Sequence, residues 1–270
     1  MDDESFRKIL NYFNLAWKGY RKVRKGVKKR LYRHMQQLGC SRVEDYLDLL
    51  SRQPELEKEC RLHLTVSISR FFRDRSLWEI LQRQILPDMT AGRQAAFRVW
   101  SCGCARGEEA YSFAILWDRL KSLQPDMPPT RIWATDLHPQ YLAMAKQGVY
   151  GRSSLKEMHR DRIQRNFDKI PGKERYRVKP FLQQVVCFER LDIIRASPPS
   201  NAFELVFARN HVLTYYRPPE KERALEKIVG SLVPGGLLVT GAHEKIPDYF
   251  DCLQPCRAHP WLFFKCREPG

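Results

Sequence analysis

The stretch that decides the fold is Phe97-Arg-Val-Trp-Ser-Cys-Gly-Cys-Ala-Arg-Gly-Glu-Glu-Ala-Tyr111. An apolar strand is expected to end at Ser101, Gly103 and Gly107 bracket a tight turn, and a helix is expected to begin at Glu108. Glycine lets the backbone approach a ligand closely. Open α/β sheets bind ligands beyond the carboxyl ends of their strands. The stretch therefore predicts a ligand site at the end of a strand.

The glycine spacing of this turn narrows the class of ligand. It is Gly-x-x-x-Gly, which is neither the Gly-x-Gly-x-x-Gly pattern of dinucleotide sites nor a phosphate loop with Gly-Lys-Ser/Thr. Glu108 and Glu109 stand at the helix start, where a phosphate would otherwise dock, so they disfavour an anion and suit a cation. S-Adenosylmethionine carries an amino group and a sulfonium and no phosphate. The alternative is that both glutamates only complement the helix dipole.

Short apolar runs alternate with helical patterns after residue 92. The runs are 97–100, 131–135, 184–188, 205–208, 237–240 and 261–265, and the helical patterns are 108–120, 139–147 and 218–232. Such alternation predicts an α/β fold with a doubly wound, mostly parallel sheet.

The first 90 residues have a helical pattern instead. One helix is predicted from an apolar stripe with three- and four-residue steps, formed by Tyr20, Val23, Val27, Leu31, Met35 and Leu38. A further helix is expected from Ser69 to Leu86, with a turn near Phe72. We therefore expect a small N-terminal helical domain at residues 1–90 and a ligand-binding domain at residues 91–270.

Charge and hydropathy limit the cellular setting and the partner. No apolar run approaches the roughly 20 residues of a membrane helix, and no apolar signal region follows Met1, so we expect a cytoplasmic protein without membrane insertion. The net charge is +16, and nine Lys or Arg without an acid lie between Lys18 and Arg33. This basic segment suits nucleic acid, an acidic membrane surface or an acidic protein, unless it is only a solvated helix face. The chain has no recognisable nucleic-acid-reading motif, so we do not expect nucleic acid as the partner.

The eight cysteines are scattered, and without a secretory signal they are expected to be reduced thiols. Cys252-x-x-x-Cys256 with Cys266 and His259 matches no common zinc template, so no metal site is predicted.

Two more acids follow predicted strands. Ile132-Trp-Ala-Thr-Asp136 lies one β-α unit after the glycine turn, which suits an acid that accepts both ribose hydroxyls of a nucleoside. Alternatively, Asp136 caps the helix that follows it. Asp192 follows a later strand and could meet an adenine amino group.

These pieces together resemble the chemotaxis-receptor methyltransferase (CheR-type) family, which methylates glutamate side chains of bacterial chemoreceptors. The matching segments run in order over nearly the whole chain: 31–39 with 46–47, 67–74, 100–112, 134–136, 203–210, 232–238 and 241–244. The resemblance implies an S-adenosylmethionine-dependent protein-glutamate O-methyltransferase with a seven-stranded methyltransferase sheet. It also implies that the basic helix Lys18–Arg33 meets an acidic protein, such as the cytoplasmic helices of a chemoreceptor.

The resemblance also implies roles for individual residues. Glu109 would hold the amino group of S-adenosylmethionine, Asp136 the ribose, and Asp192 and Ile193 the adenine. The other implied cofactor contacts are Ser67, Ser69, Arg73, the turn glycine Gly103, Arg209 and Asn210. Arg73 would supply the cation for the acceptor carboxylate, and Tyr215 would be its hydrogen-bonding partner. These two form the predicted catalytic pair.

The chain departs from the family pattern mainly on the acceptor side. Ala105-Arg106 replaces Ser-Thr before the glutamates, and Thr214 occupies the position of a family tyrosine, with Tyr215 and Tyr216 next. The family ending Gly-His-Ser-Glu is here Gly241-Ala-His-Glu244. Residues 151–186 lack the glycine-spaced segment by which some members hold a receptor-tail peptide, so no such tether is expected. A different acceptor, such as a small molecule, is the alternative.

Overall fold

The computed structural model describes residues 1–67, 69–257 and 259–266, and the chain divides into two compact units. The first unit comprises Met1–Ser67 with Asn210–Leu225, and the second comprises Ile68–Arg209 with Glu226–Gly270. Within the described residues, none of the helices is long and apolar enough to span a bilayer.

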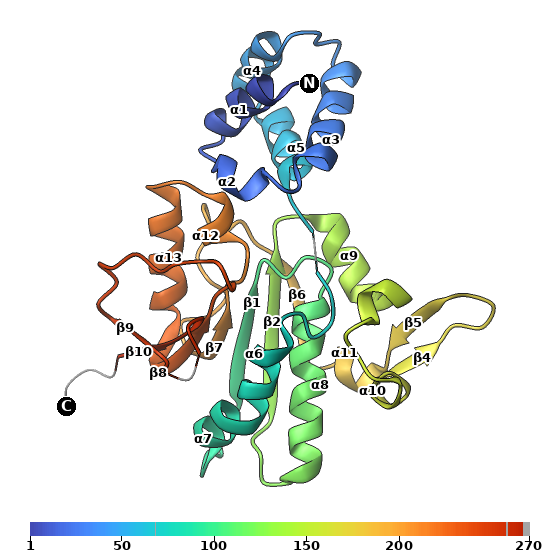
Figure 1. The fold of residues 1–270 in the computed structure, drawn as a ribbon, viewed down its shortest axis with the longest axis vertical. Helices are drawn as coiled ribbons and strands as arrows, with labels where there is room; N and C mark the ends of the chain where they lie inside the picture. The colour runs from blue at the N-terminus through green and yellow to red at the C-terminus, as the bar shows by residue number, and fades with distance from the viewer. Residues whose placement is uncertain (68, 258, 267–270) are drawn as a thin grey trace. The chain divides into compact units, whose positions relative to one another are not determined.

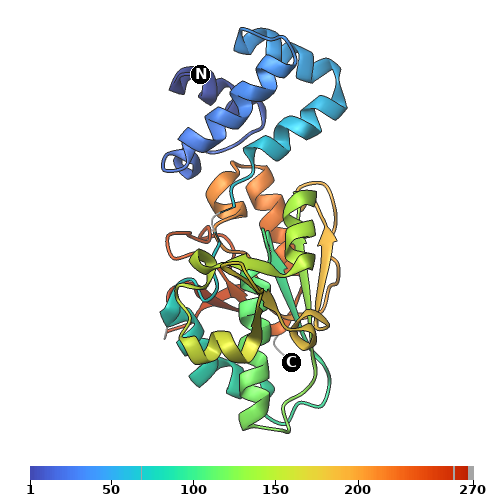
Figure 2. The same ribbon diagram turned by 90° about the vertical axis from the view of Figure 1, so that its right-hand side faces the viewer.

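The first unit is helical, and Figure 2 shows its blue helices gathered together. It contains α1 (Asp3–Tyr12), α2 (Trp17–Tyr20), α3 (Arg24–Gln37), α4 (Val43–Arg52), α5 (Pro54–Leu64) and α12 (Val212–Tyr215). The predicted stripe supplies much of its core, because Tyr20, Val27, Leu31 and Met35 are all buried. The single helix predicted there is wrong in one respect: a turn at residues 21–23 separates α2 from α3.

The second unit begins with a loop and an irregular helix. α6 (Arg75–Ile80) continues through a π-helical turn (Leu81–Ile85) into α7 (Leu86–Thr90). The helix was predicted to begin at Ser69, but it begins six residues later, at Arg75. The reason is local, since Phe72 and Asp74 have φ of 53° and 62°, in the left-handed region that a right-handed helix excludes.

A seven-stranded sheet forms the centre of the second unit, in the order β6-β2-β1-β7-β8-β10-β9. Its strands are β1 (Phe97–Cys102), β2 (Thr130–Asp136), β6 (Val186–Arg190), β7 (Phe203–Phe207), β8 (Leu232–Val239), β9 (Leu253–Pro255) and β10 (Leu262–Lys265). The four pairings that join β6, β2, β1, β7 and β8 are parallel, and β10 is antiparallel to both neighbours. The predicted mostly parallel α/β methyltransferase sheet is thus confirmed, and β9 is the strand that the sequence did not predict.

Helices between the strands cover this sheet. Figure 1 shows α8 (Glu108–Leu123) lying along β1 and β2, and α9 (Pro139–Gln147) follows β2. α13 (Glu220–Gly230) precedes β8. All three match helices predicted from the sequence.

A second, three-stranded sheet at the side of α10 and α11 was not predicted (Figure 1). It consists of β3 (Val149–Gly151), β4 (Phe167–Lys169) and β5 (Arg175–Val178), all antiparallel, with β5 in the middle. A 3-10 turn (Arg152–Leu155), α10 (Arg160–Asn166) and α11 (Pro180–Gln183) accompany it.

Candidate functional site

The predicted cofactor residues of the second unit follow neighbouring parallel strands. In register, Cys102 of β1 is opposite Thr135 of β2, and Ser101 is opposite Phe207 of β7. Asp136 at the end of β2 is opposite Arg190 of β6. The loops after these strands therefore leave the sheet at one edge, which is where open α/β sheets bind ligands.

The glycine turn after β1 is tightly held. Gly103 and Gly107 have φ of 77° and 86°, and Ala105 between them has φ of 49°. The backbone N–H groups of Gly103 and Cys104 both donate to the Thr135 carbonyl, at 2.8 and 2.9 Å. At Gly107, a Cβ atom would lie 3.0 Å from the side chains of Ala145 and Phe188, so packing as well as φ requires glycine there.

Asp136 ties this turn to the next β-α unit. One carboxylate oxygen accepts from the Ala105 N–H at 2.8 Å, and the other accepts from the His138 N–H at 2.8 Å. The N-cap position of α9 is His138 and not Asp136, so the helix-cap alternative does not describe its contacts. Each carboxylate oxygen can accept more than one hydrogen bond, which leaves capacity for ligand hydroxyls.

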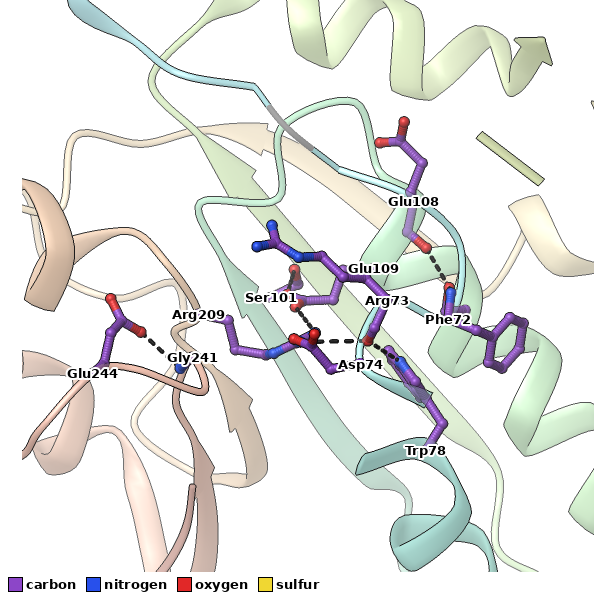
Figure 3. Close-up of polar contacts among 11 residues, drawn as sticks. Phe72, Arg73, Asp74, Trp78, Ser101, Glu108, Glu109, Arg209, Gly241 and Glu244 are labelled. Atoms are coloured by element: carbon purple, nitrogen blue, oxygen red, sulfur yellow. Dashed lines mark hydrogen bonds and ion pairs between the residues drawn. The ribbon is translucent and has the colours of Figure 1, made fainter. Parts of the chain in front are cut away.

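Glu109 belongs to a buried charge cluster with Arg209 and Asp74 (Figure 3). The Ser101 hydroxyl donates to one Glu109 carboxylate oxygen at 2.7 Å, and Arg209 Nη1 donates to the other at 3.0 Å. Arg209 Nη2 donates to Asp74. The Arg209 side chain is only 4% exposed.

The charges of this cluster favour a cationic ligand. One guanidinium faces two carboxylates, so Asp74, Glu109 and Arg209 together carry a charge of −1. A charge that is removed from water is stabilised by a nearby opposite charge. An ammonium group beside Glu109 would supply it.

The loop Ser69–Asp74 carries Arg73 over the sheet edge, and its backbone is anchored at several points. Phe71 N–H donates to the Ser154 carbonyl at 3.0 Å, and Phe72 N–H donates to Ser112 Oγ at 2.9 Å. The Arg73 carbonyl accepts from Trp78 Nε1 at 2.8 Å (Figure 3). Arg73 is half-buried and lies in this loop, not in a helix. The hydrogen bonds that anchor the loop therefore fix its position.

The adenine candidates lie in the loop after β6. Asp192 Oδ1 accepts from the Ile194 N–H at 3.1 Å, and Ile193 is buried. Lys227 Nζ donates to the carbonyls of Ile193, Ile194 and Ala196 at 3.0, 2.9 and 2.9 Å. Lys227 was not among the predicted site residues, because no local sequence pattern marks a lysine that binds a distant loop.

Three predicted site residues, Ser67, Asn210 and Tyr215, belong to the first unit. Ser67 Oγ is buried and has no hydrogen-bond partner among the described residues. Asn210 has φ of 52°. The Tyr215 carbonyl accepts from the Ala16 N–H at 2.8 Å, and its ring centroid lies 5.0 Å from that of Tyr20.

Glu108 and His259 are two further titratable groups of the second unit whose pKa values are shifted. Burial raises the pKa of Glu108, although Arg106 at 3.2 Å opposes this shift. Burial also lowers the pKa of His259, and the charge of Arg209 lowers it further. Only Glu109 of the Glu-Glu pair therefore belongs to the Arg209 cluster. His259 and Asp74 were not among the predicted site residues.

Among the described residues, the cysteines do not gather with other metal-binding side chains. All eight are free thiols. Within residues 1–67, 69–257 and 259–266, Cys252, Cys256 and Cys266 do not meet His259 as a set of ligands.

Comparisons with known proteins identify the family of the chain. The family described as CheR methyltransferase, SAM binding domain, matches residues 67–259. A chemotaxis protein methyltransferase of Listeria innocua is 32% identical over 183 residues, which cover 68% of this chain and 67% of the relative. Chemotaxis protein methyltransferase 1 of Pseudomonas aeruginosa is 30% identical over 247 residues, which cover 89% of each. Among solved structures, the N-methyltransferase NodS from Bradyrhizobium japonicum has a TM-score of 0.33 at 16% identity, over 63% of each chain.

Proposed function

The chain belongs to the CheR methyltransferase family, and from this premise we propose that it methylates glutamate carboxylates of an acidic protein such as a chemoreceptor. Family membership confirms the predicted resemblance, the reaction class and S-adenosylmethionine as the cofactor. The observation that carries the proposal is the Glu109 carboxylate, held by Ser101 and Arg209 at the edge where a cationic cofactor binds.

The residues of this chain fit the cofactor that the family uses. The Asp74–Arg209–Glu109 cluster has an uncompensated negative charge for the amino group. Asp136 has acceptor capacity for the ribose, and Gly103 allows a close backbone approach. Ser67 Oγ is a buried polar atom that a ligand could satisfy. The further proposed contacts are Ser69, Arg73, Asp192, Ile193 and Asn210.

S-Adenosylmethionine supplies an electrophilic methyl group on its sulfonium. A glutamate acceptor is already ionised at neutral pH, so the chain needs no strong general base. Its task is to hold the acceptor carboxylate in line, about 3 Å from the carbon that it attacks. We assign this orientation to the Arg73 guanidinium and the Tyr215 hydroxyl.

The basic segment is the proposed docking surface for the acidic partner. Arg24 and Lys28 pair with Asp3, and Arg30 donates to the His63 and Thr65 carbonyls. The remaining six basic side chains are exposed: Lys18, Arg21, Lys22, Lys25, Lys29 and Arg33. This surface lies in the proposed N-terminal domain, residues 1–90. The proposed methyltransferase domain comprises residues 91–270. A chemoreceptor substrate, methylated on its cytoplasmic helices, would place the enzyme in the cytoplasm.

Methyl transfer from labelled cofactor to receptor cytoplasmic fragments tests the proposal. Label should enter the fragment and leave it in mild alkali, because glutamyl methyl esters hydrolyse there and N-methyl groups do not. Binding of the cofactor without methyl transfer to any receptor fragment would favour a different acceptor, such as a small molecule. Thr214, at the position expected for a family tyrosine, already suggests that alternative.

The docking surface has its own test. The double variant Lys25→Glu/Lys29→Glu should weaken receptor binding and reduce the salt dependence of that binding, while cofactor affinity stays unchanged. The matched control is Lys121→Glu/Lys173→Glu, which reverses two exposed charges in the second unit. Equal losses in both double variants would refute the assignment of this surface.

A further inference from the structure

Two histidines and a glutamate meet between α3 and α5 in the first unit. They are His34 on α3, with Glu59 and His63 one turn apart on α5. One ligand atom from each side chain lies within 4.8 Å of the others. Spacing of i and i+4 places Glu59 and His63 on the same face of their helix.

We propose that His34, Glu59 and His63 form a zinc site that joins α3 to α5. Two imidazoles and one carboxylate are a known zinc ligand set, with a fourth position open to water. This site is separate from the methyl-transfer residues and does not depend on the proposed acceptor.

The observed spacing is close to what zinc requires. Ligands at about 2.1 Å from a tetrahedral zinc ion lie about 3.4 Å from one another. His34 Nε2 and Glu59 Oε2 are 3.6 Å apart, so this pair needs almost no movement. Glu59 is exposed, with its side chain 55% accessible, which gives the ion a path from solvent.

The buried histidine is oriented as a metal ligand. His34 is 2% exposed, and its Nε2 atom has no hydrogen-bond partner among the described residues. Its other ring nitrogen, Nδ1, lies 2.7 Å from the Tyr46 hydroxyl. Such a contact holds the ring of a metal-binding histidine in place.

The other groups around the cluster are compatible with a dication. Arg30 lies beside His63, but its guanidinium donates to the His63 and Thr65 carbonyls rather than to the ligand side chains. Glu59 therefore supplies the negative charge of the site.

Zinc binding to the full chain tests the proposal. Protein stripped with a chelator is titrated with Zn²⁺, and bound zinc is counted after gel filtration. The variant Glu59→Gln/His63→Asn changes two side chains outside the buried core, so it should fold. We expect it to bind one zinc ion fewer than the wild type, and each single variant to bind at least tenfold more weakly.

Matched controls exclude adventitious binding. Glu55→Gln/His159→Asn removes an exposed glutamate of α5 and an exposed histidine elsewhere, and it should keep the full zinc count. X-ray absorption at the zinc edge should show nitrogen and oxygen ligands without sulfur. Equal zinc counts in the wild type and the Glu59/His63 variant would overturn the proposal, as would a sulfur shell from the free cysteines.

Discussion

Arg209 offers the sharpest test of the charge cluster. Arg209→Met keeps a long apolar stem but leaves Glu109 and Asp74 without the guanidinium that they share. Breaking a buried ion pair by removing one partner costs about 3–5 kcal/mol. Because the Asp74 and Glu109 side chains are 29% and 14% exposed, water can partly solvate them. We therefore expect the low end, about 3 kcal/mol of unfolding free energy.

A second substitution separates this electrostatic cost from lost packing. In the wild type, Asp74→Asn removes a charged hydrogen bond with Arg209, which is worth about 1.5–3 kcal/mol. In the Arg209→Met background the same change removes an uncompensated charge, so it should be neutral or stabilising. The two substitutions should therefore couple by about 2 kcal/mol, whereas independent sites add within about 0.5 kcal/mol.

Denaturant unfolding of the four proteins measures this coupling. Tryptophan fluorescence is a suitable signal, because Trp78 stacks on Phe207 and donates to the Arg73 carbonyl. Circular dichroism should give coincident transitions if two-state analysis holds. Additive effects of Arg209→Met and Asp74→Asn would refute the shared-cation interpretation.

Four further predictions concern the cofactor edge and its surroundings. Glu109→Gln should weaken S-adenosylmethionine binding at least tenfold by calorimetry, about 1.4 kcal/mol, while the surface change Glu79→Gln should not. Asp136→Ala should also weaken it at least tenfold, and unchanged affinity would refute the ribose assignment. Gly107→Ala should lower the unfolding free energy by about 1–2 kcal/mol because φ is 86°, and a silent substitution would contradict this. Burial lowers the pKa of His259 in the folded chain, so the unfolded chain binds a proton at this side chain first as the pH falls through about 6.5, and the free energy of unfolding decreases. His259→Gln should therefore reduce the pH dependence of the unfolding free energy between pH 7 and 5.5.

The central fold could be predicted because its signals are local. The inner strands of a parallel sheet are buried on both faces, so β1 and β7 appear as short apolar runs bounded by turns. The small sheet could not be predicted in this way. Its central strand β5, Arg175–Val178, is mostly polar and has three residues that are not buried. Only pairing with β3 and β4 makes it a strand.

The candidate site was predictable where a residue follows a strand. Asp136 ends β2 and Glu109 follows β1 after one turn, so the order of the two strands brings both residues to one edge. Asp74 was not predictable, because it lies 135 positions from Arg209 and reaches it only through the left-handed turn that ends the Ser69–Asp74 loop. Sequence periodicity predicted a helix over this loop, but the positive φ angles of Phe72 and Asp74 exclude one.

Arg106 in the glycine turn has a physical consequence for the two glutamates that follow it. Arg106 pairs with the buried Glu108 at 3.2 Å, and the Tyr150 hydroxyl donates to the Arg106 carbonyl at 2.6 Å. Without this guanidinium, burial would raise the pKa of Glu108 further. Arg106 thus compensates the charge of the first glutamate, while Arg209 is shared between the second and Asp74. Because Arg209 serves two carboxylates, the Glu109 cluster retains a net negative charge for a cationic cofactor, whereas the Arg106–Glu108 pair is neutral.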